Sequence, residues 1–219
     1  MAATETRLLV LGAVSLFEPV NGYQIRRELM SWEVDRWAHI NPGSIYSCLT
    51  TLTKQGLVDR HDVLDGAREV AVYTTSDSGR TELAAMFGRA LETVEVLDPL
   101  PFHTALSMCS LFERDVIADH LDRRVGALGL HLADLRRRLD AISAGGAPPH
   151  VARVVELQVA GGEVELAWVR SMLADIRAGG LWFAGEPQEW GPPEDDPGWQ
   201  MAADADRYRS LLTARPRPS

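Results

Sequence analysis

The chain has 219 residues, a formal net charge of −9, 46% hydrophobic residues and 24% charged residues. These values are typical of a globular protein with one large domain or two small ones, and the acidic charge argues against a general nucleic-acid coat protein. The sequence contains neither an apolar run of the roughly 18 residues that span a membrane nor a signal-peptide pattern, so we expect a cytoplasmic protein without membrane contact. Two cysteines, Cys48 and Cys109, are too few for a disulfide framework and are interpreted as buried apolar side chains.

The N-terminal part of the chain predicts three helices. Dense apolar spacing favours a buried helix over 6–17, which Glu18-Pro19 ends. Asn21 is a typical N-cap residue and begins a short helix over 22–30, followed by a loop with two tryptophans. Asn41-Pro42 begins a third helix, which ends at Gly56. Its apolar residues recur at helical spacing and form an inner stripe, namely Ile45, Cys48, Leu49 and Leu52.

Two β-like runs follow, over 57–63 and 69–75, and Leu64-Asp65-Gly66 joins them. Asp-Gly between two such runs is a strong hairpin signal. Ser76 is the expected cap of a fourth helix. Three helices, a hairpin and a helix in this order predict a winged helix-turn-helix over residues 1–85, mainly α with a small β-hairpin wing.

The pattern after residue 85 is almost wholly helical. It predicts a short helix over 102–112 and two long helices over 113–142 and 151–177, joined by a Gly/Pro turn. Gly161-Gly162, inside the second long helix, indicates a kink or a close backbone approach. Because two helices alone cannot bury such broad apolar faces, residues 86–183 are predicted to be an antiparallel helical dimerisation domain of a homodimer. The expected dimerisation residues lie along the first long helix, at Leu121, Val125, Leu128, Leu132 and Leu135.

Residues 184–219 form a third segment with a different composition. A loop rich in proline, glycine and acidic residues occupies 184–198, a helix is predicted over 199–212, and a disordered tail over 214–219.

The sequence shows no catalytic or metal-binding pattern. A glycine-rich phosphate loop, a G-x-S-x-G motif and an H-E-x-x-H motif are all missing, and the six histidines have no ligand spacing. We therefore expect neither an enzyme nor a protein with a metal ion or cofactor.

The outer face of the third predicted helix carries polar, hydrogen-bonding side chains and no acidic residue. Such residues donate to DNA phosphates or contact base edges when a recognition helix enters the major groove. The alternative interpretation is a solvated polar face without a ligand. The residues on this face are Ser44, Tyr46, Ser47, Thr50, Thr51 and Lys54.

Four short motifs occur in the same order and at the same spacing as in the PadR family of bacterial transcriptional regulators, which this chain resembles from residue 22 to residue 80. They are Gly22-Tyr23-Gln24-Ile25, Gly43-Ser44-Ile45-Tyr46, Leu49-x-x-Leu52-x-x-x-Gly56-Leu57-Val58 and Tyr73-x-x-x-Asp77-x-Gly79-Arg80. The helical remainder resembles the dimerisation domain of the same family. The chain departs from the family pattern at Ser47, where proline is usual, and in the wing, where Arg68 is followed by the acidic Glu69.

The resemblance implies a regulator, most simply a repressor, that binds a palindromic operator in double-stranded DNA as a homodimer. The alternative is a winged-helix module that binds a protein partner, which the acidic net charge and the weakly basic wing leave open. The resemblance implies DNA contacts at Tyr23, Ser44, Tyr46, Lys54 and Arg68, and we add Ser47, Thr50 and the wing residue Arg60.

Members of the family sense phenolic acids, drugs or antibiotics in pockets lined by helices of the C-terminal domain, so the resemblance implies a small-molecule effector there. We expect this effector to be aromatic or polyketide-like. Aromatic side chains can stack on a planar effector, and Arg170 and Arg177 could pair with an acidic group on it. The alternative for each aromatic residue is a role as a core or interface anchor. The expected effector-binding residues are Phe102, His103, Trp168, Met172, Trp182 and Phe183.

Overall fold

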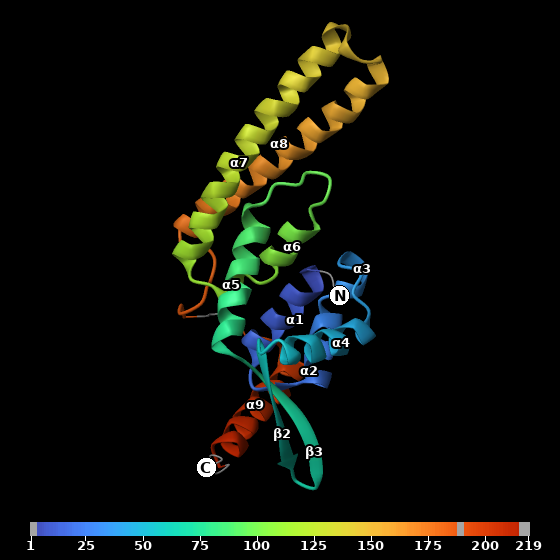
Figure 1. Ribbon diagram of the computed structural model, residues 1–219. Coiled ribbons are helices and arrows are strands. Elements are labelled where there is room, and N and C mark those ends of the chain that lie inside the picture. Colours follow the sequence, from blue (N-terminus) through green and yellow to red (C-terminus); the bar gives the residue numbers. More distant parts are fainter. Residues whose placement is uncertain (1–3, 188–190, 215–219) are drawn as a thin grey trace. The chain divides into compact units, whose positions relative to one another are not determined.

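The computed structural model describes residues 4–187 and 191–214, which form two compact units (Figure 1). The first unit comprises residues 1–87 together with 188–219, and the second comprises 88–187. The boundaries predicted from the sequence lie after 85 and after 183, whereas the structure divides the chain after 87 and after 187 and joins 188–219 to the first unit. Residues 188–190 of the acidic loop and 215–219 of the tail lie outside the described residues.

The first unit begins with α1 (Thr4–Phe17), α2 (Gly22–Ser31), the short α3 (Val34–Trp37) and α4 (Pro42–Lys54). Asn21 and Asn41 cap α2 and α4, because each side chain accepts a hydrogen bond from the backbone N–H three residues later. The predicted inner stripe of α4 is buried, which confirms the face assigned from its periodicity. The loop predicted around the tryptophans contains α3, and the indole N–H of Trp37 donates to the carbonyl of Trp32 at 2.8 Å.

The wing consists of β2 (Val58–Asp65) and β3 (Arg68–Thr75), which pair antiparallel and meet at Asp65 opposite Arg68. The turn is therefore Gly66-Ala67, one residue later than the sequence predicts, and Gly66 has a φ of +65°. A two-residue strand, β1 (Val20–Asn21), pairs with β3 and completes a sheet of order β1-β3-β2. Strand β1 is not among the elements predicted from the sequence.

The fourth helix, α5 (Asp77–Glu92), starts against the beginning of the wing. The Ser76 hydroxyl accepts from the N–H of Gly79 at 3.0 Å, which confirms Ser76 as the cap. A Cβ at residue 79 would lie 1.9 Å from the carbonyl oxygen of Leu57, so only glycine fits there. Arg80 pairs with Glu18 at 2.5 Å. Gly79 and Arg80 of the fourth motif therefore have structural roles.

A last helix, α9 (Pro197–Thr213), packs against the wing sheet within the first unit. Tyr208 is 2% exposed and forms a buried cluster with Val63 and Val72. Val70, Leu211 and Leu212 surround this cluster. Burial of this apolar face holds the C-terminal helix on the winged helix.

The second unit contains α6 (Leu100–Leu106), the 3-10 turn η1 (Cys109–Leu111), α7 (Arg114–Ala141), the π-turn η2 (Ile142–Gly146) and α8 (Pro149–Arg177). The predicted helix over 102–112 is thus divided, with Ser107 as the C-cap of α6. Helices α7 and α8 form the predicted antiparallel hairpin (Figure 1). A Cβ at Gly162 would lie 2.8 Å from Cδ2 of Leu132, which confirms a close approach of α8 to α7.

One charged residue lies in the interior of the second unit. Arg124 is 1% exposed and pairs with Glu165 at 2.5 Å. Its guanidinium also donates to the carbonyls of Leu91 and Thr93, and it lies 3.7 Å from the centre of the Phe102 ring. These partners compensate for the loss of hydration of the buried charge.

Across the described part of the chain, no helix has the length and apolar character needed to cross a membrane. The same residues contain no group of three or more histidine, cysteine, aspartate or glutamate side chains that could hold a metal ion. Both cysteines are buried, and burial raises the pKa of Cys48 to about 11 and that of Cys109 to about 12. This confirms their interpretation as unreactive, apolar side chains.

Candidate nucleic-acid interface

The outer face of α4 presents a row of hydroxyl groups to solvent. Ser47 and Thr50 are exposed, and each hydroxyl donates to the backbone carbonyl four residues earlier, at 3.1 and 3.0 Å. Ser44 is half-buried, and its hydroxyl donates to the carbonyl of Asn41 at 2.7 Å. In these positions the hydroxyl oxygens can accept hydrogen bonds, but donation to a phosphate requires each hydroxyl to rotate. Lys54 is exposed in the last turn of the helix.

Tyr46 combines a packing role with an exposed surface. A Cβ at Gly22 would lie 3.1 Å from Cε1 of Tyr46, so the ring lies directly against the first residue of α2. The residue is nevertheless 44% exposed. Tyr46 can be both a packing residue and a surface contact, because its ring packs while its hydroxyl remains available to a partner.

The two wing arginines have different surroundings. Arg60 pairs with Asp62 on the same strand at 2.8 Å, and this pairing raises the pKa of Arg60. Arg68 lies at the start of β3, is exposed, and makes no ion pair with any described residue. Of the two, Arg68 is therefore the better available cation for a phosphate.

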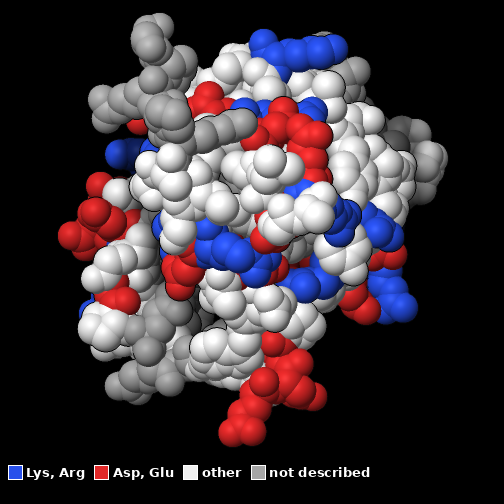
Figure 2. All heavy atoms as spheres, turned by 90° about the horizontal axis from the view of Figure 1, so that it is seen from below, with Lys and Arg blue, Asp and Glu red and all other residues white. Residues whose placement is uncertain are grey.

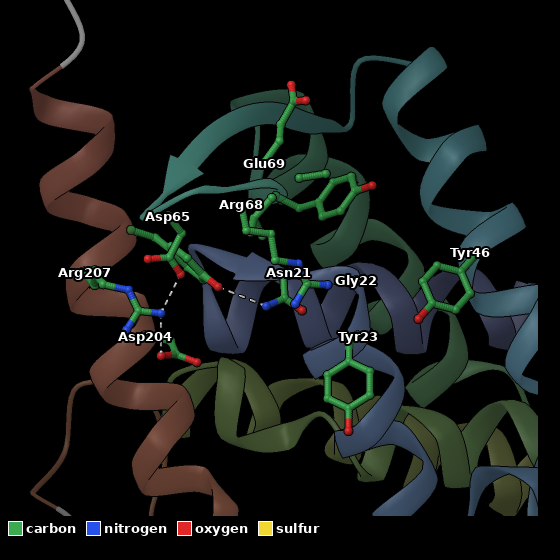
Figure 3. Close-up of a pocket in the computed structure, with 13 residues that line it drawn as sticks. Asn21, Gly22, Tyr23, Tyr46, Asp65, Arg68, Glu69, Asp204 and Arg207 are labelled. Carbon is green, nitrogen blue, oxygen red and sulfur yellow. Dashed lines mark hydrogen bonds and ion pairs between the residues drawn. The ribbon is translucent and has the colours of Figure 1, made fainter.

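A groove of about 600 Å³ lies between the start of α2, strand β3 of the wing, Tyr46 and α9 (Figure 3). All four tyrosines of the chain, Tyr23, Tyr46, Tyr73 and Tyr208, line this groove. Figure 3 shows Arg68 reaching from the wing toward the start of α2. The structure thus brings together three of the predicted DNA-contact residues, Tyr23, Tyr46 and Arg68, from three different elements.

The charge of the groove is mixed. Arg68 and Arg207 share it with Asp65, Glu69 and Asp204. Figure 2 likewise shows acidic side chains among the basic ones on the face it displays. Attraction of a polyanion to this surface would therefore depend on a few well-placed cations more than on a broad basic patch.

Sequence reasoning missed the contribution of α9 to this groove. Asp204, Arg207 and Tyr208 all line it, yet they are far in sequence from the motifs of the winged helix. The only available signal was the apolar spacing of Met201, Ala205 and Tyr208, which predicts that one face is buried without indicating its partner.

Ring contacts link part of the set of residues predicted to bind an effector. Phe102 contacts Trp168 edge-to-face, with ring centres 6.1 Å apart, and its centre is 6.3 Å from that of the exposed His103. Phe183 is buried and packs against the guanidinium of Arg114, which also pairs with Glu186.

The remaining residues of this set have varied surroundings. Trp182 is exposed and Met172 is half-buried. Arg177 pairs with Asp122 on α7, which leaves Arg170 as the more available cation for an acidic group on a ligand. Phe102, His103 and Trp168 are therefore the members of the set that ring contacts join.

The expected dimerisation stripe requires a correction. Leu121, Leu128, Leu132 and Leu135 are at most 1% exposed within a single chain, and Val125 is half-buried. The leucines face the interior of the α7–α8 unit, so they are not a surface for a second copy. The periodicity identified a buried face correctly, but α8 helps to cover it.

A different apolar stripe is exposed on α8. When Gly161 at its centre is counted, the stripe has a residue every three or four positions, which is the spacing of a coiled-coil seam. The stripe consists of Val154, Leu157, Val164 and Trp168, whose exposed fractions are 57%, 70%, 73% and 47%.

Comparison with known proteins connects the first unit to a family. Residues 10–85 match the sequence pattern of the Transcriptional regulator PadR-like family. None of the curated proteins is similar enough in sequence to count as a relative.

Among solved structures, the chain is similar to Bacillus subtilis PadR in complex with operator DNA, with 23% identity and a TM-score of 0.33 over 78% of this chain and 98% of that one. It is also similar to the PadR-like regulator BC1756 from Bacillus cereus, with 18% identity and a TM-score of 0.33 over 80% and 97% of the two chains. A third structure is Bacillus subtilis PadR in complex with p-coumaric acid, with 21% identity and a TM-score of 0.29 over 79% and 99%.

The matched segment contains α2, α4, the wing and the start of α5, which are the elements that carry the four sequence motifs. The chain therefore carries, in residues 10–85, a winged-helix domain of the PadR-like family of transcriptional regulators.

Proposed function

We propose that the protein is a repressor that binds a palindromic DNA operator through α4, the start of α2 and the wing. The observation that carries this proposal is the groove that Tyr23, Tyr46 and Arg68 line together. A phenol hydroxyl and a guanidinium are both good donors to phosphate oxygens, and an α-helix such as α4 fits the major groove. The outer face of α4 carries no acidic side chain, so this part of the surface repels the DNA phosphates least.

The proposal includes a homodimer formed through α8. The stripe of Val154, Leu157, Val164 and Trp168 exposes large apolar side chains at coiled-coil spacing, and a second copy of the same stripe would bury them. Two winged helices held in this way must reach major grooves about 34–36 Å apart, and a dimer with this symmetry selects a two-fold symmetric DNA site.

Regulation by a small aromatic molecule is the third part of the proposal. Trp168 belongs to the exposed stripe and also contacts Phe102, so a planar ligand that stacks there would touch both the core of the second unit and the proposed dimer surface. A ligand that changes the packing of the two copies would change the spacing of the recognition helices and release the operator.

Selection from a pool of random DNA duplexes tests the proposed DNA binding. We expect enrichment of a two-fold symmetric site with half-sites about 10 base pairs apart, centre to centre. Tyr46→Ala should lose the enrichment while keeping its fold by circular dichroism. Failure of the wild-type protein to enrich any sequence would contradict the proposal and favour a winged helix that binds a protein partner.

A further inference from the structure

A continuous chain of polar contacts crosses α9 from the start of α2 to the turn of the wing. It begins at the two residues of the α2 capping box, Asn21 and Gln24, whose side chains each satisfy the other's backbone N–H. Each of these side chains uses its remaining polar group to donate to α9. Asn21 Nδ2 donates to Tyr208 Oη at 3.1 Å, and Gln24 Nε2 donates to Asp204 Oδ2 at 2.8 Å.

The series of polar contacts continues from Asp204 to the wing. Arg207 pairs with Asp204 at 2.9 Å and with Asp65 at 2.8 Å (Figure 3). Asp65 is the last residue of β2 and lies opposite Arg68 across the turn. The side chain of Asp204 therefore joins Gln24 to Arg207, and Arg207 joins α9 to the tip of the wing.

The buried part of α9 reinforces these contacts. Tyr208 packs on the sheet against Val63 and Val72, and its hydroxyl is the one that Asn21 contacts. A β-hairpin is marginally stable by itself, so packing on one face restricts the positions that the wing can adopt. The start of α2 and the wing are the two sides of the groove that contains Tyr23 and Arg68.

We propose that α9 is a brace that sets the distance between the start of α2 and the wing, and that it thereby determines the affinity of the groove for a DNA strand. The inference rests on the proposed DNA binding. Asp204, Arg207 and Tyr208 are positioning residues, since they act through Asn21, Gln24 and Asp65. Arg207 also offsets the negative charge of Asp65 and Asp204 beside the proposed path of the strand.

Arg207→Ala is the variant that breaks the link between α9 and the wing, and Arg209→Ala is its matched control. Arg209 is on the same helix and carries the same charge, but it pairs with Asp206 and donates to the carbonyl of Glu18. It makes no hydrogen bond or ion pair with a described residue of β2 or β3. Two measurements on the 219-residue chain separate the variants. These are hydrogen exchange at the amides of residues 64–71 without DNA, and affinity for the selected duplex at several salt concentrations.

We expect Arg207→Ala to accelerate exchange in the wing and to weaken DNA binding by up to about fivefold, since a partly exposed ion pair contributes little by itself. The salt dependence of binding should match that of the wild type, because a positioning residue neutralises no phosphate. Arg209→Ala should leave wing exchange unchanged. Tyr208→Phe, which keeps the packed ring and removes only the hydroxyl, should weaken binding in the same direction and provides the test if Arg207→Ala does not fold.

Four results would overturn the brace. Wing exchange at the wild-type rate in Arg207→Ala would show that α9 does not restrain the wing. Faster exchange with unchanged affinity would show that the restraint does not affect DNA. A salt slope reduced by about 0.9 per protomer would identify Arg207 as a direct phosphate contact, and tighter binding would identify α9 as an inhibitor.

The brace and the proposed function fail in different ways. If the wild-type protein binds no duplex, the proposed function is wrong, and wing exchange still decides whether α9 restrains the wing. If Tyr46→Ala loses DNA binding while Arg207→Ala behaves as the wild type in both measurements, DNA binding stands and the brace is wrong.

Discussion

The ring of Tyr46 lies against Gly22, at the point where α4, the proposed recognition helix, meets the first residue of α2. A methyl group at residue 22 would lie 3.1 Å from Cε1 of the ring, closer than ordinary van der Waals contact. The glycine of the first motif and the tyrosine of the second are therefore one structural unit. Their pairing holds the phenol at the edge of the groove.

This contact predicts a graded effect on DNA binding. Tyr46→Ala removes both ring and hydroxyl and should weaken operator binding about tenfold or more, the effect of losing a hydrogen bond to a charged group. Tyr46→Phe keeps the ring against Gly22 and should lose less. Gly22→Ala should shift the ring and weaken binding without removing any polar atom. Fluorescence anisotropy with a labelled duplex measures all three, and equal affinities across the series would contradict a role for Tyr46.

The exposed stripe of α8 predicts where the dimer can be disrupted. Val164→Asp introduces a charge into the proposed seam, where an unpaired buried charge is strongly unfavourable. We expect light scattering to give the mass of a monomer. Leu97→Asp is the control, because Leu97 is also highly exposed but lies outside the stripe. A stable Val164→Asp dimer, or a monomeric wild-type protein, would show that α8 is not the seam.

Contact between Trp168 and Phe102 predicts the effector-binding site. Titration with planar aromatic acids and phenols should identify a ligand that quenches tryptophan fluorescence and releases DNA over the same concentration range. Trp168→Ala should weaken both effects roughly threefold to tenfold, in the range of an aromatic stacking contact. Trp182→Ala is the matched control, since Trp182 is exposed and has no such ring contact among the described residues. A releasing ligand that is indifferent to Trp168 would locate the site elsewhere.

The buried pair of Arg124 and Glu165 predicts a large effect on stability. Glu165→Ala leaves the Arg124 charge buried without its counterion, and we expect a loss of about 3–5 kcal/mol in the free energy of unfolding. Glu163→Ala, two residues earlier on α8, breaks an exposed pair with Arg136 and should cost at most about 1 kcal/mol. Urea denaturation measures both. Similar losses for the two variants would contradict the role assigned to Arg124.

Local signals in the sequence predicted most elements of the winged helix. Asn21 and Asn41 are caps, Asp65-Gly66 marks the wing turn to within one residue, and Ser76 caps α5. Each of these features depends on residues within a few positions of one another. Strand β1 has no such signal, since its two residues are extended only because they pair with β3, about fifty positions later.

Partners of a buried face were harder to predict than the face itself. The leucine spacing of α7 is the same whether α8 or a second chain covers it, and the expected dimer stripe proved to be internal. The same limit hid the position of α9. Its spacing indicates one buried face, but the contacts of Tyr208 with Asn21 and of Arg207 with Asp65 join residues that the sequence places far apart.

DNA binding through α4 is tested most directly by the salt dependence of operator affinity in the wild type, in Lys54→Ala and in Arg153→Ala. Lys54 is exposed on α4, whereas Arg153 carries the same charge on α8, outside the winged helix. We predict that Lys54→Ala weakens binding and reduces the slope of log K against log salt by about 0.9 per protomer, since one phosphate contact is lost. Arg153→Ala should match the wild type. Identical slopes and affinities for Lys54→Ala and the wild type would contradict the assignment of α4 as the recognition helix.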